Sequence, residues 1–129
     1  MSNNPADSMP FSKLMGVDVL QARKESVIGE LEVRPDLCTT GHILHGGAIM
    51  AFADALGGIA GFMNLPEGAS GTITVESKTN FVAAAKEGST VTGECLPVSV
   101  GKRLSVWQTT IRREDGKTAA IVTQTQMVL

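Results

Sequence analysis

The longest apolar stretch of the chain runs from Leu37 to Pro66 and contains a single formally charged side chain, Asp54. Gly46 and Gly47 open a run of Ala, Ile, Met, Phe and Leu that is long enough for roughly four turns of helix at ~1.5 Å per residue. Pro66 stops such a helix because proline has no N–H to donate. We therefore predict a helix that begins near Gly46 and ends before Pro66.

On both sides of this helix the pattern changes to alternating and β-branched residues, which favour strands. Phe11, Leu14 and Met15 have helical spacing and predict one short helical turn first. Pro97 implies an edge or a bulge, and the Asp-Gly pair at 115–116 is typical of a tight hairpin. The predicted strands are 17–22, 27–33, 72–81, 90–100, 103–113 and 118–129.

A helix that is apolar on every face needs cover on both sides, and a curved antiparallel sheet provides it. We therefore predict an α+β fold in which such a sheet wraps around one long central helix. The polar residues 1–10 are expected to form a flexible N-terminus, and 11–129 a single domain. The open edges and uncovered back of such a sheet favour dimerisation, through strand pairing or sheet faces.

Composition narrows the classes of function. The chain has 129 residues, 43% of them hydrophobic, and a formal net charge of −2, so nucleic acid is not an expected partner. Two cysteines without metal-ligand spacing, and no leader pattern, point to the cytoplasm. A membrane-spanning helix is the alternative for 43–65. We expect no membrane partner, because Asp54 at its centre would cost about 2.5–3.5 kcal/mol.

Asp54 is the first candidate for chemistry. An ionised carboxylate in an apolar helix is costly unless it is paired, hydrogen-bonded or functional, so a structural Asp and a catalytic Asp are both open. The N–H of Gly46, in the first turn, has no partner inside the helix and lies at the positive end of the helix dipole. It is suited to bind a developing oxyanion.

The motif His-Gly-Gly-Ala-x-x-Ala-x-Ala-Asp from His45 to Asp54, followed by Gly-Gly-x-Ala-Gly at 57–61, resembles the hotdog-fold acyl-CoA thioesterases of the phenylacetate-pathway and hydroxybenzoyl-CoA types. The similarity runs from about Phe11 to Leu129. The resemblance implies a hotdog fold, an acyl-CoA or acyl carrier protein thioester as substrate, no cofactor, no metal, and active sites shared between two subunits.

The resemblance also implies roles for single residues. Asp54 matches the catalytic carboxylate, as general base or nucleophile, and Gly46 the amide that polarises the thioester carbonyl. Thr39 stands where relatives carry Asn or Gln. Gly58 stands where some relatives carry a Ser or Thr that supports the acid, so that supporting hydroxyl is assigned to Thr74.

Four further residues complete the predicted site. His45 joins the catalytic set at the start of the helix, where it would hydrogen-bond the backbone. Gly47, Lys102 and Arg103 form the predicted substrate-binding set. Lys102 and Arg103 would contact CoA phosphates, and ordinary solvated charge is the alternative for them and for the pair at 112–113.

Two other kinds of site are weaker alternatives. His42, His45 and Asp54 contain metal-ligand types but lack a convincing further ligand, and His45 packing at the helix start is the simpler interpretation. Cys38 and Cys95 lack a neighbouring cation or matching helix N-terminus that would lower a thiol pKa, so neither is expected to act as a nucleophile.

These observations predict a cytoplasmic thioesterase that hydrolyses an aryl or medium-chain acyl-CoA, or an acyl carrier protein thioester, to the free acid and thiol. A homodimer would be the minimal unit, and a homotetramer the expected assembly. A non-catalytic acyl-CoA-binding module is the leading alternative, although binding alone does not require Asp54. A hydratase is the third, and would need a catalytic His with the Asp.

Overall fold

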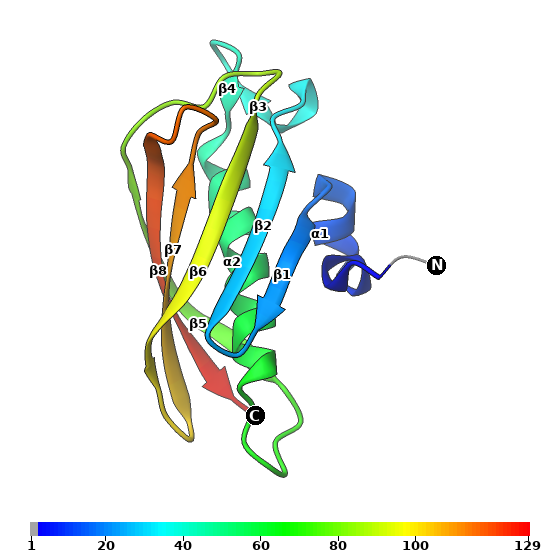
Figure 1. The fold of residues 1–129 in the computed structure, drawn as a ribbon, viewed down its shortest axis with the longest axis vertical. Helices are drawn as coiled ribbons and strands as arrows, with labels where there is room; N and C mark the ends of the chain where they lie inside the picture. Colours follow the sequence, from blue (N-terminus) through cyan, green and yellow to red (C-terminus); the bar gives the residue numbers. More distant parts are fainter. Residues whose placement is uncertain (1–2) are drawn as a thin grey trace.

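A six-stranded antiparallel sheet wraps around one long helix in the computed structural model, which describes residues 3–129 (Figure 1). The central helix is α2 (Gly46–Met63), and the strand order is β1-β2-β6-β7-β8-β5. This confirms the predicted α+β architecture. The strands of the sheet are β1 (Asp18–Arg23), β2 (Ser26–Glu32), β5 (Thr72–Phe81), β6 (Thr90–Val100), β7 (Leu104–Arg112) and β8 (Thr118–Val128).

The predicted bounds of α2 are confirmed. Before its first residue, the His45 side chain accepts a hydrogen bond from the Gly47 N–H and caps the helix. At the other end Asn64 is the C-cap, two residues before Pro66. The helix is long and apolar enough to cross a bilayer, but nine of its eighteen residues are buried inside this fold. It is the core helix of the sheet.

Two facing glycines let the sheet approach α2 closely. Gly29 of β2 is directly opposite Gly93 of β6 in the strand register. A Cβ at Gly29 would lie 2.8 Å from Leu56 Cδ2, and one at Gly93 would lie 2.7 Å from Leu56 Cδ1. Leu56 and Phe52, both fully buried, fill the space that these missing side chains leave.

The turn chemistry behaves as the sequence predicts. The β7–β8 hairpin turns at Gly116, which has a φ of +84°, a conformation that favours glycine. Pro97 lies in β6, which is an inner strand, and the register with β7 shifts between Pro97 and Ser99. Of the two alternatives for Pro97, the structure therefore shows the bulge.

The N-terminal segment is more structured than the sequence predicts. Residues Pro5–Ser8 form the 3₁₀ helix η1, and Pro10–Met15 form α1. Ala6 is fully buried, so the described part of 1–10 packs on the domain, whereas the sequence predicts a flexible N-terminus. The Asn4 side chain connects the N-terminal segment to β1, since Asn4 Oδ1 accepts hydrogen bonds from the N–H groups of Ala6 (3.3 Å) and Val19 (3.0 Å).

Three short elements before α2 were not predicted. They are η2 (Pro35–Leu37), β3 (Cys38–Thr39) and β4 (Ile43–Leu44). The last two form a small hairpin whose turn places both Gly41 (φ +84°) and His42 (φ +58°) in the left-handed region. This hairpin leads the chain directly into the first turn of α2.

The two edges of the sheet differ. β1 has six residues and an irregular register with β2, and it lies beside α1 and η1 (Figure 1). β5 has ten residues and pairs with β8 alone within the described chain. Short, bulged or covered edges resist pairing with other chains, whereas a long open edge invites it. β5 is therefore the edge available for association.

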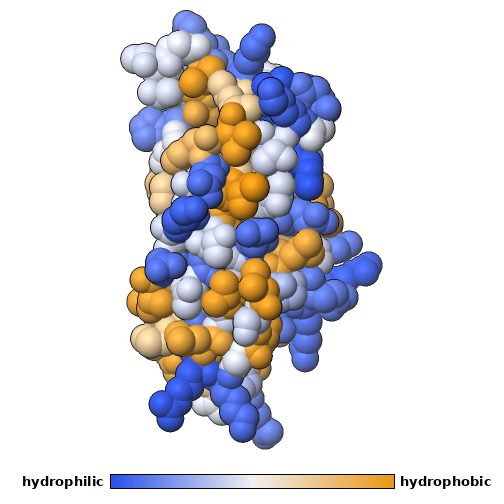
Figure 2. Space-filling model, turned by 90° about the vertical axis from the view of Figure 1, so that its left-hand side faces the viewer, coloured by the Kyte–Doolittle hydropathy of each residue, from blue (hydrophilic) through white to orange (hydrophobic). Residues whose placement is uncertain are grey.

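The outer face of the sheet is partly apolar. Figure 2 turns the side of β7 and β8 towards the viewer and shows apolar groups separated by polar ones. We define the outer patch as a set of exposed large side chains on β6, β7 and β8 near the β6–β7 hairpin. Its members are Leu96, Val98, Val100, Leu104 and Met127.

Candidate active site

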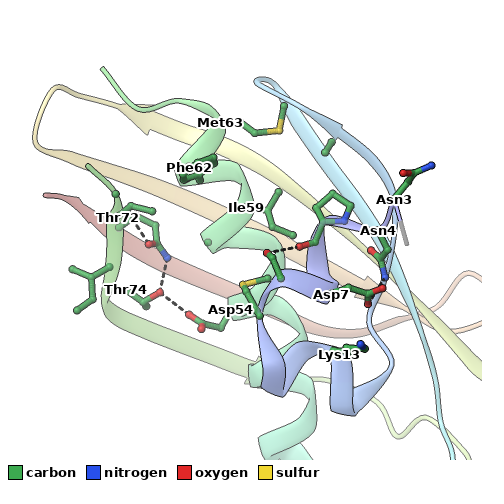
Figure 3. Close-up of a pocket in the computed structure, with 18 residues that line it drawn as sticks. Asn3, Asn4, Asp7, Lys13, Asp54, Ile59, Phe62, Met63, Thr72 and Thr74 are labelled. Carbon is green, nitrogen blue, oxygen red and sulfur yellow. Dashed lines mark hydrogen bonds between the residues drawn. The ribbon is translucent and has the colours of Figure 1, made fainter. Parts of the chain in front are cut away.

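Asp54 lies midway along α2, and its carboxylate is held by β5. The Thr74 hydroxyl donates a hydrogen bond of 2.6 Å to Asp54 Oδ1 (Figure 3). Asp54 is exposed in the single chain although its neighbours Ala53 and Ala55 are buried. The structure therefore brings together the predicted acid and its predicted supporting hydroxyl.

A cavity of about 1200 Å³ opens beside this pair. Apolar side chains of α2 line one part of it, namely Ile59, Phe62 and Met63 (Figure 3). Met9 of the N-terminal segment also lines the cavity. The N-terminal segment that the sequence left without a role thus forms a wall of the cavity. Such a space is suited to an apolar group with Asp54 at one side.

The start of α2 presents a second set of predicted residues. Gly46 is the first helical residue, so its N–H has no carbonyl partner within the helix. The Gly47 N–H donates to His45 Nδ1 at 2.8 Å, which assigns the proton of a neutral His45 to Nε2. The Phe81 ring packs against Gly46, where an added Cβ would lie 3.2 Å from it. Of these two glycines, Gly46 is thus the one whose N–H remains available to bind a ligand.

One chain does not bring the two halves of the predicted site together. Gly46 and Asp54 are separated by ~12 Å along the helix axis. Thr39, on β3, belongs to the hairpin that leads into the Gly46 end, whereas Thr74 contacts Asp54. In one chain the predicted site residues therefore lie in two groups, which we call half-sites, one at the start of α2 and one at its middle.

The predicted phosphate contacts lie elsewhere. Lys102 and Arg103 are exposed in the β6–β7 hairpin, at the opposite end of the molecule from the start of α2 (Figure 1). Neither lines the cavity beside Asp54. In the other basic pair, Arg113 contacts Asp115, and Arg112 lies 3.8 Å from Glu94.

The alternative chemistries find little support. The His42 Nδ1 atom lies 3.4 Å from Glu87 Oε1, and His45 caps α2, so the two histidines have separate contacts. Within residues 3–129, no three His, Cys, Asp or Glu side chains are grouped for a metal ion. Burial raises the pKa of the Cys95 thiol to about 11 and, with Glu87 and Asp36, raises that of Cys38.

Two functional candidates were missed from the sequence. Gln124 and Gln126 of β8 are both buried, and Gln126 donates a hydrogen bond of 2.5 Å to Thr74 Oγ1. Alternating glutamines in a strand indicate an outward polar face, but here the outward residues are those between them. No sequence signal marks them, because their inward orientation depends on the register that pairs Thr74 with Gln126 in the folded sheet.

Comparisons with known proteins agree on the family. The family model described as Thioesterase superfamily matches residues 41–120, more than half of the chain. A 1,4-dihydroxy-2-naphthoyl-CoA hydrolase of Escherichia coli K12 is 39% identical over 75 residues, which cover 58% of this chain and 54% of that protein. The proofreading thioesterase EntH of Cronobacter sakazakii is 32% identical over 75 residues, covering 58% of this chain and 53% of that protein. The chain thus spans about half the length of these curated relatives.

The solved structures show the same fold. A Haemophilus influenzae thioesterase superposes with a TM-score of 0.89 at 25% identity, covering 98% of this chain and 87% of that one. The Escherichia coli PaaI protein of the phenylacetic acid degradation operon gives 0.87 at 17% identity, covering 95% and 86%. The sheet around one helix is therefore the hotdog fold, and the chain belongs to the thioesterase superfamily.

Proposed function

We propose that this protein hydrolyses an aryl or medium-chain acyl thioester of CoA, or of an acyl carrier protein, to the free acid and thiol. The observation that carries the proposal is the Asp54 carboxylate, held by Thr74 at 2.6 Å and open to a cavity that is lined in part by apolar side chains. A structural carboxylate would be enclosed and fully paired. This one is oriented by one hydrogen bond and exposed on the side of the cavity.

The chemistry follows from the two half-sites. Asp54 takes a proton from a water molecule, and the water oxygen bonds to the thioester carbonyl carbon. The carbonyl oxygen becomes an oxyanion that the Gly46 N–H stabilises, which is typically worth about 3–4 kcal/mol. Collapse breaks the C–S bond, and the thiolate leaves and takes up the proton. Direct attack by Asp54 through an anhydride is the alternative that we rank second.

We further propose that two protomers complete each site. The ~12 Å between Gly46 and Asp54 along α2 prevents both from reaching one carbonyl in the same chain. Pairing of the open edges of β5 from two chains would bring α2 of each beside the other and would satisfy the backbone groups that point away from β8 along this ten-residue strand. The homodimer is the minimal active unit, and the outer patch is the proposed contact between dimers in a homotetramer.

The cavity supports an apolar acyl group, and a CoA carrier has support from neighbours of the same fold. A Streptococcus pneumoniae thioesterase with a TM-score of 0.80 and 20% identity, covering 88% of this chain and 86% of that chain, is described with coenzyme A. We propose that Lys102 and Arg103 contact the nucleotide phosphates at a solvent-exposed rim. Changing either to Ala should then raise KM severalfold for acyl-CoA and leave acyl-pantetheine unaffected, with the difference shrinking at high salt.

The test is a hydrolysis panel with the purified chain. Aryl, short, medium and long acyl-CoAs and one acyl carrier protein thioester are compared by release of free thiol. We expect turnover of aryl or medium-chain acyl-CoA, with kcat/KM falling for acetyl-CoA. Tight binding of these ligands without thiol release would instead identify a non-catalytic acyl-CoA-binding module.

A further inference from the structure

Two fully buried glutamines lie behind the half-site of Asp54. Gln124 and Gln126 are 0% and 1% exposed, on the face of β8 that covers α2. Their neighbour on the same face, Val122, is apolar and also fully buried. A buried amide is costly unless its donors and acceptor are all paired, so two in succession require a reason. Their hydrogen bonds supply it.

The two side chains connect the backbone of α2 to its carboxylate. Gln124 Nε2 donates to the Ala53 carbonyl oxygen at 2.9 Å, and Gln126 Nε2 donates to Gln124 Oε1 at 2.7 Å. Gln126 Nε2 also donates to Thr74 Oγ1 at 2.5 Å, and Thr74 donates to Asp54 Oδ1 at 2.6 Å. We call Gln124 and Gln126 the glutamine relay. It begins at Ala53 and ends at the next residue of the same helix.

The first hydrogen bond of the relay, to the Ala53 carbonyl, determines which group donates and which accepts in all the others. The Ala53 carbonyl can only accept, so Gln124 must present its NH₂ there and its oxygen to Gln126. Gln126 must therefore present its NH₂ to Gln124, and the second proton of that group reaches Thr74. A hydroxyl has one proton, and with its oxygen already accepting from Gln126, the Thr74 proton goes to Asp54.

The helix is shaped to accommodate the relay. A Cβ at Gly57 would lie 2.2 Å from the amide carbon of Gln124, and a Cβ at Gly61 would lie 3.2 Å from Gln126 Cγ. On the far side, the Thr72 hydroxyl lies 3.1 Å from both Gln126 Oε1 and the Met127 carbonyl oxygen, which share its one proton. The relay amides are thus enclosed by α2 and β5.

We propose that Gln126, oriented by Gln124, is a positioning residue for hydrolysis and acts through Thr74. By donating to Thr74 Oγ1, it fixes the Thr74 hydroxyl as a donor to Asp54 Oδ1. The carboxylate is then held in one orientation, and Oδ2 is left for the water proton. This inference rests on the proposed thioester hydrolysis and adds residues that contact neither the substrate nor the reacting atoms.

The test compares Gln126→Met, which keeps the side-chain length and removes the amide, with Gln108→Met as a matched control. Gln108 is an exposed glutamine of β7 that contacts Thr123. We expect Gln126→Met to lower kcat by about tenfold or more, because a general base that is no longer held in one orientation loses part of its catalytic contribution. The KM of the variant should stay within about twofold of the wild-type value. Gln108→Met should leave both unchanged. A folded Gln126→Met enzyme with normal kcat would overturn the proposal.

A double-mutant cycle isolates the link through Thr74. In a Thr74→Val background, Gln126→Met should cause no further loss of kcat, whereas independent effects would add. Thr74→Ser, which keeps the hydroxyl, should retain kcat. If Gln126→Met does not fold, Gln126→Glu keeps the shape with fewer donors, and equal kcat for Thr74→Val and Thr74→Ser would also refute the relay.

A spectroscopic measurement separates this inference from the proposed function. The side-chain amide resonances of Gln126, followed by ¹⁵N NMR, should shift on Asp54→Asn and stay constant when that change is made in a Thr74→Val background. Absence of this coupling would refute the relay whether or not the protein is an enzyme. Wild-type protein that hydrolyses no thioester, but shows the coupling, would refute only the proposed function.

Discussion

At the scale of the residue, Asp54 combines two properties that a structural carboxylate does not have. It is the single formal charge between Leu37 and Pro66, and its carboxylate faces an open cavity although the residues on both sides are buried. One hydrogen bond from Thr74 orients it. The site therefore contains an ionisable group that is positioned but accessible, as a general base must be.

The first prediction is that Asp54→Asn folds and assembles as the wild type does, but loses about 10²-fold or more in kcat, because the amide cannot accept the water proton. Steady-state kinetics and thermal unfolding of the same preparation check this. Asp18→Asn, at an exposed position of β1, is the control. A structural Asp54 would give the reverse result, with a lower Tm and a normal kcat for the folded fraction.

The second prediction concerns Cys95, whose thiol pKa burial raises from 9.0 to about 11. The folded state favours the neutral thiol, so this contribution to stability is complete below about pH 9 and is lost as the pH rises towards 11. The stability of the wild type relative to Cys95→Ala should therefore decline across that window. Urea unfolding at successive pH values measures the difference, and a constant difference would contradict the assignment.

At the scale of the element, helix α2 is fitted to the sheet by the absence of side chains on one face. Gly57 and Gly58 are adjacent in sequence but differ in surroundings. A Cβ at Gly57 would overlap Gln124, whereas one at Gly58 meets nothing within 4 Å. The same substitution should thus have opposite effects at neighbouring positions.

The third prediction is that Gly57→Ala lowers the free energy of unfolding by about 1–3 kcal/mol, as overpacking typically does. Gly58→Ala should raise it by up to about 1 kcal/mol, because alanine is the better helix former. Urea unfolding of both variants provides the comparison. Equal destabilisation by the two changes would contradict the prediction, because it would mean that the close contact with Gln124 does not distinguish Gly57 from Gly58.

The elements were predictable because each has a local cause. The lone charge of Asp54 within an apolar run, the stop at Pro66 and the Asp-Gly turn at 115–116 are all visible in a few neighbouring residues. The buried N-terminal segment was not predictable, since it depends on Asn4 bonding Val19, fifteen residues away. The inward face of Gln124 and Gln126 likewise depends on strand register, which alternation alone does not determine.

At the scale of the whole molecule, the long edge of β5 and the separation of Gly46 from Asp54 call for a second protomer. The fourth prediction is that light scattering gives a dimer or a dimer of dimers. Asp54→Asn and Gly46→Pro should each be inactive, and mixing them should restore activity. One of the two sites in each heterodimer then combines an intact Gly46 with an intact Asp54.

Gly46→Pro is suited to this experiment because proline is tolerated at the first helical position and removes only the N–H. The exposed Phe81 ring can move to accommodate it. Subunit exchange is verified with differently tagged chains. If exchange is complete and no activity returns, each site is formed within one chain.

The glycines of α2 also have a consequence for how the protein folds. Gly57, Gly58 and Gly61 each weaken an isolated helix by about 1 kcal/mol relative to alanine, so α2 has little tendency to form before the sheet exists. Its Ala53 carbonyl is bonded by Gln124, 71 residues later in the chain. We therefore expect the middle turn that carries Asp54 to become ordered only when β8 docks, and the hydrogen-bonded amide protons in the buried turns of α2 to exchange with solvent only through global unfolding.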